Sequence, residues 1–502
     1  MTFVVTNAQM KAAEAEADRT GVSYSRLMYN AGCACAEEIT RIVTDKAKSI
    51  AVVCGKGNNG GDGYVIANRL AELGYSEVYA VFSALPKTEC AGHYFRVCTE
   101  NTGVCIISEE TFKSEQSTYY AAVDCIYGTG FHGSLPEDAA ALIKKANKSP
   151  VRIAVDVPSG VNSDNGEFDE DCFKPTDTII IAAIKKGFLS PACADLLGKI
   201  SVAEIGIGED CYSEYEARIS DDSFRNPFLP RKRSSHKGTY GRLMNIAGSF
   251  CYNGAAAMST KAALRSGVGL CMLAAPRSVI AMHAASMNEA TYLPLPENAD
   301  GFAAEGAVEL IGCQLKKMNA VSVGCGMGNN ETTRKITEYV IRNADCPIII
   351  DADGINCLSG NIDILKERKA AAVLTPHPLE LSRISGIPVK DIQSDRLGTA
   401  KRFAAEYEVV LVLKGAFTVI AAPDGTAYVN PTGNPGLARG GSGDTLAGII
   451  AAMLAQGIDP LSAAAAGVYC HGLAADILLD RLPMECMLPT DIISALTEVF
   501  RS

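Results

Sequence analysis

Short apolar runs recur along this chain of 502 residues, and most of them are separated by stretches with a helical pattern. Apolar runs of about five residues predict buried β-strands. Strands that alternate with helices predict a parallel sheet with helices on both faces, because each parallel connection must cross over the sheet. The first half of the chain has five such runs: Ile50–Cys54, Val78–Phe82, Ala121–Asp124, Ile153–Asp156 and Thr178–Ala183.

The pattern breaks between residues 221 and 239 and then restarts. The break contains prolines, serines and three consecutive basic residues but few apolar ones, which is typical of a domain boundary. We therefore expect an α/β fold of two tandem three-layer domains, 1–224 and 225–502. The second domain has the runs Leu243–Ala247, Leu270–Ala274, Ala320–Val323, Ile348–Asp351, Ala372–Leu374 and Val409–Leu413, a hairpin turn at Pro423–Gly425, and Ala-rich helices at 445–456 and 461–479.

Composition restricts the partners of the chain. Its 46 Lys and Arg against 57 Asp and Glu give a net charge of −11, which disfavours nucleic-acid binding. The one basic run, Arg231–Arg233, is interpreted as a solvated linker. No apolar stretch reaches the roughly 18 residues of a membrane span. The 18 cysteines are scattered without a CxxC pair, which indicates free thiols and no zinc site. We expect a soluble cytoplasmic protein that binds neither nucleic acid nor membrane.

A glycine-rich segment, 55–63, joins the first strand to a helix predicted over 64–73. Gly55, Gly57 and Gly60 have the G-x-G-x-x-G spacing that lets backbone N–H groups approach a pyrophosphate. The second strand, however, ends in Phe82-Ser83 without the acidic residue of a dinucleotide fingerprint, and no Lys-Ser or Lys-Thr completes a P-loop. The amides and carboxylate among the glycines predict a loop that binds an anion through N–H groups and a cation through side-chain oxygens.

Two further strand ends carry carboxylates. Asp124 precedes a second glycine-rich loop, 128–134, and Asp156 begins the segment Asp156-Val157-Pro158-Ser159-Gly160. The carboxyl ends of parallel strands meet at one edge of a sheet, so these segments are expected to converge. Either aspartate taken singly could be only a helix cap, but their common position favours one site.

These three segments resemble the NAD(P)H-hydrate epimerase family, which has a Rossmann-like fold and interconverts the R and S forms of hydrated NADH and NADPH (NADHX and NADPHX). The resemblance implies that Asp156 contacts the substrate as an acid or base, and that Asn59, Asp124 and Ser159 ligate a potassium ion. Lys56, where a proline is usual, lies outside this set. The other implied substrate contacts are Asn58, Asn59, Gly60, Gly61, Asp62, Gly128, Thr129, Gly130, Phe131, His132, Gly133 and Ser134.

A second glycine cluster, 433–444, precedes a helix predicted from Thr445. Gly441 to Gly443 are expected to present successive N–H groups to phosphate oxygens at the helix N-terminus. Asp444 is placed to accept the proton of an alcohol, and phosphoryl transfer to an alcohol needs little beyond positioning, charge neutralisation and such a base. Asp444 as a mere N-cap is the alternative interpretation.

The second half resembles the ribokinase-like NAD(P)H-hydrate dehydratase family from about Gly238 onward. The resemblance implies a nucleotide-dependent activation of the C6 hydroxyl of the S hydrate, with ADP, or ATP, and Mg²⁺. Cys325 and Leu379 replace a usual proline and glycine. Implied hydrate contacts are Ala255, Gly326, His377 and the catalytic base Asp444; implied nucleotide contacts are Lys414, Gly415, Ala416, Phe417, Thr418 and Gly443.

Both halves together resemble bifunctional NAD(P)H-hydrate repair enzymes over nearly the whole chain. A ribokinase-type small-molecule kinase fused to a dinucleotide-binding sensor is the competing hypothesis, and a first domain that serves only as a scaffold is another. If the alanines of the last two helices are exposed, they indicate a homo-oligomer, and a tetramer is the form we expect.

Overall fold

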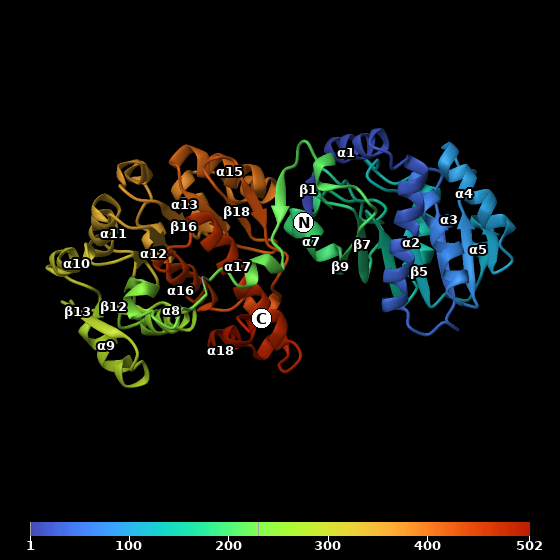
Figure 1. Cartoon of the computed structure of the whole chain (residues 1–502). Coiled ribbons are helices and arrows are strands. Elements are labelled where there is room, and N and C mark those ends of the chain that lie inside the picture. The colour runs from blue at the N-terminus through green and yellow to red at the C-terminus, as the bar shows by residue number, and fades with distance from the viewer. Residues whose placement is uncertain (1, 229, 502) are drawn as a thin grey trace. The chain divides into compact units, whose positions relative to one another are not determined.

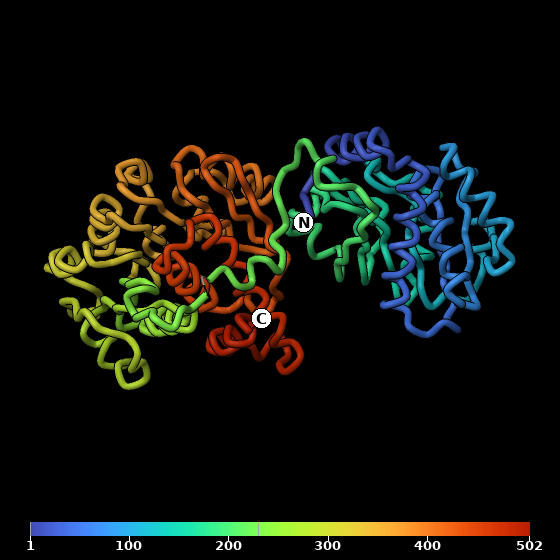
Figure 2. The backbone as a smooth tube through the Cα atoms, viewed as in Figure 1, coloured from blue at the N-terminus to red at the C-terminus, as the bar shows by residue number. Residues whose placement is uncertain are grey.

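The computed structural model describes residues 2–228 and 230–501. The chain forms two compact units, Met1–Arg218 and Ile219–Ser502, and each is described by itself. Figures 1 and 2 trace both units, coloured along the chain.

Unit 1 is built on a parallel sheet of seven strands. From β2 the chain moves outward to β3 and β4 and then returns to place β5 on the other side of β2, so the strand order reverses between β2 and β5. In open α/β sheets the crevice at such a reversal is where ligands bind. The order across the sheet is β4 (Val104–Ser108), β3 (Val78–Phe82), β2 (Ile50–Cys54), β5 (Ala121–Cys125), β6 (Val151–Val155), β7 (Asp177–Ile181) and β9 (Lys199–Ala203).

Helices cover both faces of this sheet, because its strands are apolar on both sides. Ile50, Val52 and Cys54 pack with α2 (Tyr24–Ile42), α3 (Asn58–Glu72) and α4 (Glu89–Glu100), which lie side by side in Figure 1. Ala51 and Val53 pack in a second core with α5 (Glu109–Ser114) and α6 (Glu137–Ala146). The remaining elements are α1 (Asn7–Arg19), α7 (Pro191–Leu196) and the strands β1 (Phe3–Val5), β8 (Ile184–Lys185) and β10 (Ala217–Ile219).

The helix α3 begins six residues before the predicted start, so the prediction of a loop over 58–63 was wrong. The glycines allow this early start because the first turns pack directly on the strand ends. A Cβ at Gly60 would lie 1.9 Å from the Gly55 carbonyl oxygen, and one at Gly63 would lie 2.7 Å from Cys54 Sγ. Asn58 to Asp62 are therefore fixed on a helix N-terminus against the sheet edge.

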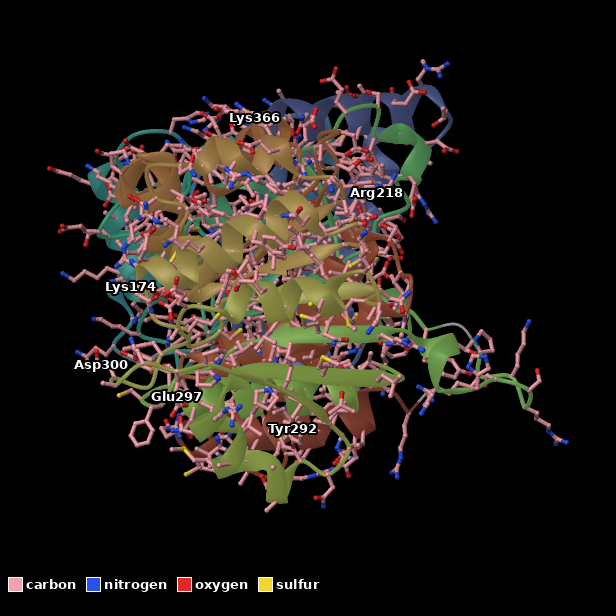
Figure 3. All side chains as sticks on the ribbon, turned by 90° about the vertical axis from the view of Figure 1, so that its left-hand side faces the viewer. Lys174, Arg218, Tyr292, Glu297, Asp300 and Lys366 are labelled. Atoms are coloured by element: carbon pink, nitrogen blue, oxygen red, sulfur yellow. The ribbon has the colours of Figure 1, made fainter. Side chains whose placement is uncertain are left out.

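Unit 2 has a larger sheet in which the seven strands β11 to β17 are parallel. The strands β18 and β19 are antiparallel, which confirms the predicted hairpin. Tyr292 of β13 and Glu297 and Asp300 after it are labelled in Figure 3, at the edge of this sheet. The order is β13 (Thr291–Leu295), β12 (Leu270–Pro276), β11 (Arg242–Ile246), β14 (Ala320–Val323), β15 (Ile348–Ile350), β16 (Ala372–Leu374), β17 (Val410–Leu413), β18 (Val419–Ala421) and β19 (Ala427–Val429).

The helices α8 (Asn253–Arg265), α16 (Ser442–Ala455), α17 (Pro460–Leu478) and α18 (Pro489–Val499) share one hydrophobic core with this sheet. The other helices of unit 2 are α9 (Arg277–His283), α10 (Ala307–Leu315), α11 (Glu331–Asn343), α12 (Ala352–Asn356), α13 (Pro378–Ser385), α14 (Val389–Ser394) and α15 (Arg396–Tyr407).

The alanines of α16 and α17 are buried in this core rather than exposed, including Ala451, Ala452 and the run Ala463–Ala466. The argument for an oligomer from exposed alanines was therefore wrong. The helix α17 is long and apolar enough to cross a membrane by length and composition, but 72% of its apolar window is buried inside the protein. It is a core helix of unit 2.

Candidate active sites

The predicted epimerase residues lie at the carboxyl edge of the unit 1 sheet, where the strand order reverses. The Asn59 side-chain amide donates to the Tyr127 carbonyl at 2.9 Å, and the Ser159 N–H donates to Asp124 Oδ2 at 2.7 Å. These contacts join the segments that follow β2, β5 and β6. The structure thus brings together three segments that are about 65 and 35 residues apart in the sequence.

The N-terminus of α3 presents unused hydrogen-bond donors at this edge. Gly57 is the N-cap and has no side chain to satisfy them. None of the described residues accepts a hydrogen bond from the N–H groups of Asn58, Asn59 or Gly60, whereas the Gly61 N–H donates to the Gly57 carbonyl. Free N–H groups and the helix dipole together make a site for an anion such as a phosphate.

Beside this terminus lies a cluster of buried oxygen atoms. Asp124 is 1% exposed and accepts hydrogen bonds from the Ile126 N–H and from both the N–H and the hydroxyl of Ser159. Burial outweighs these bonds and raises the pKa of Asp124 to about 6. The Asn59 Oδ1 atom is buried without a partner among the described residues. An orphaned amide oxygen beside a desolvated carboxylate and a hydroxyl suits a hard cation.

Asp156, the predicted acid or base, sits in a strained backbone conformation with φ of 67°. Strain of this kind in a non-glycine residue persists only where the surroundings enforce it. The Asp156 carboxylate is held by the Ile181 N–H and by Lys185 on β8, whose ammonium lies 2.6 Å from Asp156 Oδ1 and also donates to the carbonyls of Ile181 and Ala183. Lys185 is 1% exposed. Sequence reasoning missed it because it lies in no glycine loop.

Two more carboxyl groups face this ion pair. Burial, and then the charges of Asp156 and Glu14, raise the pKa of Asp62 well above its usual value. Burial and Asp156 likewise raise the pKa of Glu14, while Lys185 lowers it. Both carboxyl groups thus hold a proton more readily than they would in water, because burial and the like charge of Asp156 disfavour their ionised forms.

The loop 128–134 borders this cluster. Gly128 lies against the Asn59 side chain, and the Thr129 carbonyl accepts hydrogen bonds from Asn7 and Ser163. Phe131 is buried with its ring 5.5 Å from that of Tyr127. His132 lies 3.2 Å from Asn162 through their side-chain nitrogens, while Gly130 and Gly133 border open space. The other loop residue, Ser134, is exposed.

The second predicted site lies at the N-terminus of α16. Gly441 caps the helix in a left-handed conformation with φ of 98°. The Ser442 N–H donates to the Arg439 carbonyl, so the expectation of successive free N–H groups from 441 to 443 was wrong at that residue. The N–H groups of Gly443 and Asp444 have no acceptor among the described residues. The donors available to an anion are thus shifted toward the predicted base.

Asp444, which is half-buried, lies beside the buried side chains of Cys325 and Asp351. Their ligand atoms all lie within 4.8 Å of one another, which is compatible with a bound metal ion. Burial and the charge of Asp351 raise the pKa of Asp444 to about 6. A carboxylate of this kind suits a general base, because it is ionised at neutral pH yet remains a good proton acceptor. The two carboxylates fit Mg²⁺, which prefers oxygen ligands, better than the thiol does.

Lys414 connects this group to the nucleotide loop. Its ammonium lies 2.9 Å from Asp351 Oδ1 and 3.8 Å from Glu380 Oε2, and a Cβ at Gly443 would lie 3.4 Å from it. Burial alone would lower the pKa of Lys414, but the carboxylates of Asp351 and Glu380 raise it overall. The lysine is therefore a fixed positive charge beside the N–H groups of α16. Of the rest of its loop, Phe417 has a φ of 52°, and Gly415, Ala416 and Thr418 follow β17.

The predicted hydrate contacts are placed around the same centre. Gly326 packs on the α8 N-terminus, since a Cβ there would lie 2.7 Å from that of Ala255. His377 caps α13: its Nδ1 accepts from the Glu380 N–H, and its own N–H donates to Glu380. Burial lowers the pKa of His377, so this imidazole favours the neutral form.

Sequence reasoning missed Asp351, Glu380 and the role of Cys325. For Asp351 a signal existed, because it follows an apolar strand just as Asp124 and Asp156 do in the first half. Glu380 carries no such signal, since its position three residues into a helix is equally typical of a capping residue.

Two family models match the chain. One is described as NAD(P)H-hydrate dehydratase and matches residues 243–498; the other is described as YjeF-related protein N-terminus and matches residues 24–187. The bifunctional NAD(P)H-hydrate repair enzyme Nnr of Moorella thermoacetica is 36% identical over 491 residues, covering 95% of this chain and 92% of that protein. The enzyme of the same name from Escherichia coli is 36% identical over 490 residues, covering 96% and 91%.

A solved structure of the ADP/ATP-dependent NAD(P)H-hydrate dehydratase from Bacillus subtilis, co-crystallised with ATP and Mg²⁺, also resembles the chain. It is 34% identical with a TM-score of 0.50, and the match covers 57% of this chain and 98% of that one.

The fold and the two sites define a tandem α/β protein that presents free helix N-termini and buried carboxylates to anionic ligands at the carboxyl ends of its strands. The comparisons make this class specific. The chain belongs to the family of bifunctional NAD(P)H-hydrate repair enzymes. The predicted fold, a Rossmann-like domain followed by a ribokinase-like one, is confirmed, and the hypothesis of a kinase fused to a sensor module is not favoured.

Proposed function

We propose that the chain repairs hydrated NADH and NADPH in two steps. Unit 1 interconverts the R and S hydrates, and unit 2 dehydrates the S hydrate to NADH or NADPH at the expense of ADP. The observation that carries the proposal is the repeated arrangement in each unit: free N–H groups at a helix N-terminus near a half-buried aspartate, at the carboxyl edge of a parallel sheet.

In unit 1, the N–H groups of Asn58 to Gly60 would bind the pyrophosphate and so direct the hydrated ring toward Asp156. Inversion at C6 needs a bond at that carbon to break and re-form. When a base takes the proton of the C6 hydroxyl, the oxygen forms a C=O bond, the C6–N1 bond breaks and N1 gains a proton. Closure of N1 on the other face of this carbonyl, with both protons moved back, gives the other epimer. Asp156 is suited to take the hydroxyl proton because Lys185 holds its carboxylate in one orientation, while burial and the charge of Asp156 raise the pKa of Asp62 and Glu14 nearby. Asn59, Asp124 and Ser159 would hold a potassium ion that offsets the charge of the desolvated aspartate.

In unit 2, Asp444 would take the proton of the C6 hydroxyl as that oxygen attacks the β-phosphorus of ADP. The bond to the α-phosphate bridge breaks and AMP leaves. Loss of a proton from C5 and cleavage of the C6–O bond then release phosphate and leave the C5=C6 double bond of the dihydronicotinamide. Lys414 and the N–H groups of Gly443 and Asp444 are placed to neutralise the transferred phosphoryl group. Asp351 would hold Mg²⁺ near the phosphates, which leaves Asp444 free to act as the base.

The test is to incubate the protein with a mixture of both hydrates, with and without ADP, and to follow the absorbance of the reduced nicotinamide. Full recovery with ADP requires both activities. Recovery of about half, at times when spontaneous epimerisation is slow, would contradict the role of unit 1. A stable phosphorylated product without recovered absorbance would contradict the role of unit 2. Repeating the assay with ATP decides the preferred donor.

We also propose that the protein works in the cytoplasm. Its substrates arise wherever NADH and NADPH are kept, which supports the location. The homo-oligomer expected from the sequence, a tetramer, has lost its argument, because the alanines of α16 and α17 are buried. Light scattering during gel filtration tests this expectation, and a mass equal to that of one chain would overturn it.

A further inference from the structure

Arg396 is a buried cation beneath the nucleotide loop of unit 2. It is the first residue of α15, and its side chain is 3% exposed. The guanidinium Nη2 donates to the carbonyls of Leu413, at 3.1 Å, and Lys414, at 3.3 Å. A Cβ on Gly415 would lie 2.8 Å from the same Nη2 atom. The guanidinium therefore packs against the backbone at the start of the loop 414–418, on the end of β17.

The charge of this guanidinium is poorly matched by these contacts. Its hydrogen-bond partners are neutral: the two carbonyls and the Gln393 side-chain oxygen, which accepts from Nη1 at 3.0 Å. Its Nε is buried without a partner among the described residues. Burial lowers the pKa of Arg396 to about 10, so the group remains charged at neutral pH. A buried charge held by neutral acceptors is costly unless an ion of opposite sign approaches.

We propose that Arg396 is a positioning residue for the nucleotide of the dehydratase reaction. It fixes the backbone from which Lys414 and the loop contact the nucleotide, and its buried charge is compensated when the phosphates bind. This inference rests on the proposed nucleotide role of residues 414–418. It predicts that binding of the nucleotide's charged phosphates depends on Arg396, whereas binding of its adenosine part does not.

The experiment measures binding of ADP and of adenosine to the full-length protein by calorimetry, with no hydrate present. We expect Arg396→Gln to weaken ADP binding about tenfold or more, the scale of a lost charge-assisted contact, and to leave adenosine binding within about twofold. Arg402→Gln is the matched control: Arg402 lies on the same helix, but its side chain is 65% exposed and bonds Asp395 and Thr399. It should bind both ligands like the unmodified protein.

In the complete assay, Arg396→Gln should raise the KM for ADP while kcat at saturating ADP stays within about twofold. Equal losses for ADP and adenosine, or no loss for ADP, would overturn the inference and leave Arg396 as packing alone. If Arg396→Gln does not fold, Gln393→Ala decides, because it removes only the acceptor that orients Nη1. ADP binding about threefold weaker with unchanged adenosine binding supports the inference, and unchanged binding of both overturns it. An unmodified protein that binds neither ligand would instead contradict the proposed nucleotide function itself.

Discussion

Lowering the pH from 7 to 5 should slow the ADP-dependent dehydration about tenfold, because the proposed base then gains a proton. Asp444 has a pKa of about 6, raised by burial and by the neighbouring charge of Asp351. With that value about nine-tenths of the molecules have an ionised Asp444 at pH 7, and about one-tenth at pH 5. The rate at saturating S hydrate should follow this fraction.

Other groups around Asp444 titrate differently. Burial lowers the pKa of His471 to about 4, below the range tested. Burial also raises the pKa of Cys325 well above its usual value, so this thiol stays protonated. Burial lowers the pKa of His377 from its usual value of 6.5. This titration lies closest to that of Asp444, so it needs a separate control.

The assay is the initial rise in reduced-nicotinamide absorbance with purified S hydrate and ADP, at pH values from 5 to 8. His377→Gln should keep the inflection near pH 6, whereas Asp444→Asn should lower the rate at least about 100-fold and make the residue's titration disappear. A rate that stays constant from pH 7 to pH 5, or an inflection that moves with His377, would refute the assignment of Asp444 as the base.

Three further outcomes are expected. Cys325→Ala removes a hydrogen bond that lowers the pKa of Asp444, so the inflection of the dehydration rate should move to higher pH, and a shift to lower pH would contradict this. Potassium should raise the melting temperature of unit 1 more at pH 7.5 than at pH 5. Asp124 has a pKa raised to about 6, so its ionised form destabilises the fold by about 2 to 3 kcal/mol, and by less as the group gains its proton below pH 6. Differential scanning fluorimetry with sodium as the control measures this, and Asp124→Asn should abolish the difference. Lys185→Met and Asp156→Asn should each lower R-to-S exchange at least about 100-fold, while ADP-dependent dehydration of the S form continues. Chromatography of the two hydrates measures the exchange, and unchanged exchange in either variant would remove that residue from the mechanism.

The strands could be predicted from the sequence because their signal is local. Ile50–Cys54 and Val78–Phe82 have the bounds predicted for them, since five consecutive apolar residues leave few alternatives in a parallel sheet. The start of α3 could not be predicted in the same way. Glycine disfavours a helix by its own propensity, and the reason for it here lies in the packing: a side chain at Gly60 would clash with the Gly55 backbone.

The site residues also differ in whether a local sequence signal predicts them. Aspartates that end strands, such as Asp124 and Asp156, are predictable because the sheet places every strand end at one edge. Lys185 reaches Asp156 from β8, a two-residue strand with no pattern that a sequence could reveal.

In each unit sequence reasoning missed, among other residues, a buried basic side chain that acts on a predicted residue from another element. Lys185 fixes Asp156, and Arg396 supports the backbone of Lys414, a predicted residue that itself pairs with Asp351. A basic side chain in an apolar run or at a helix start reads as surface until the fold buries it. Once buried, such a cation needs a negative partner, and in each case the candidate partner is a carboxylate or phosphate of the site. The acidic net charge of the chain therefore does not oppose the binding of anionic nucleotides, because the cations that matter are few, buried and placed at the strand ends.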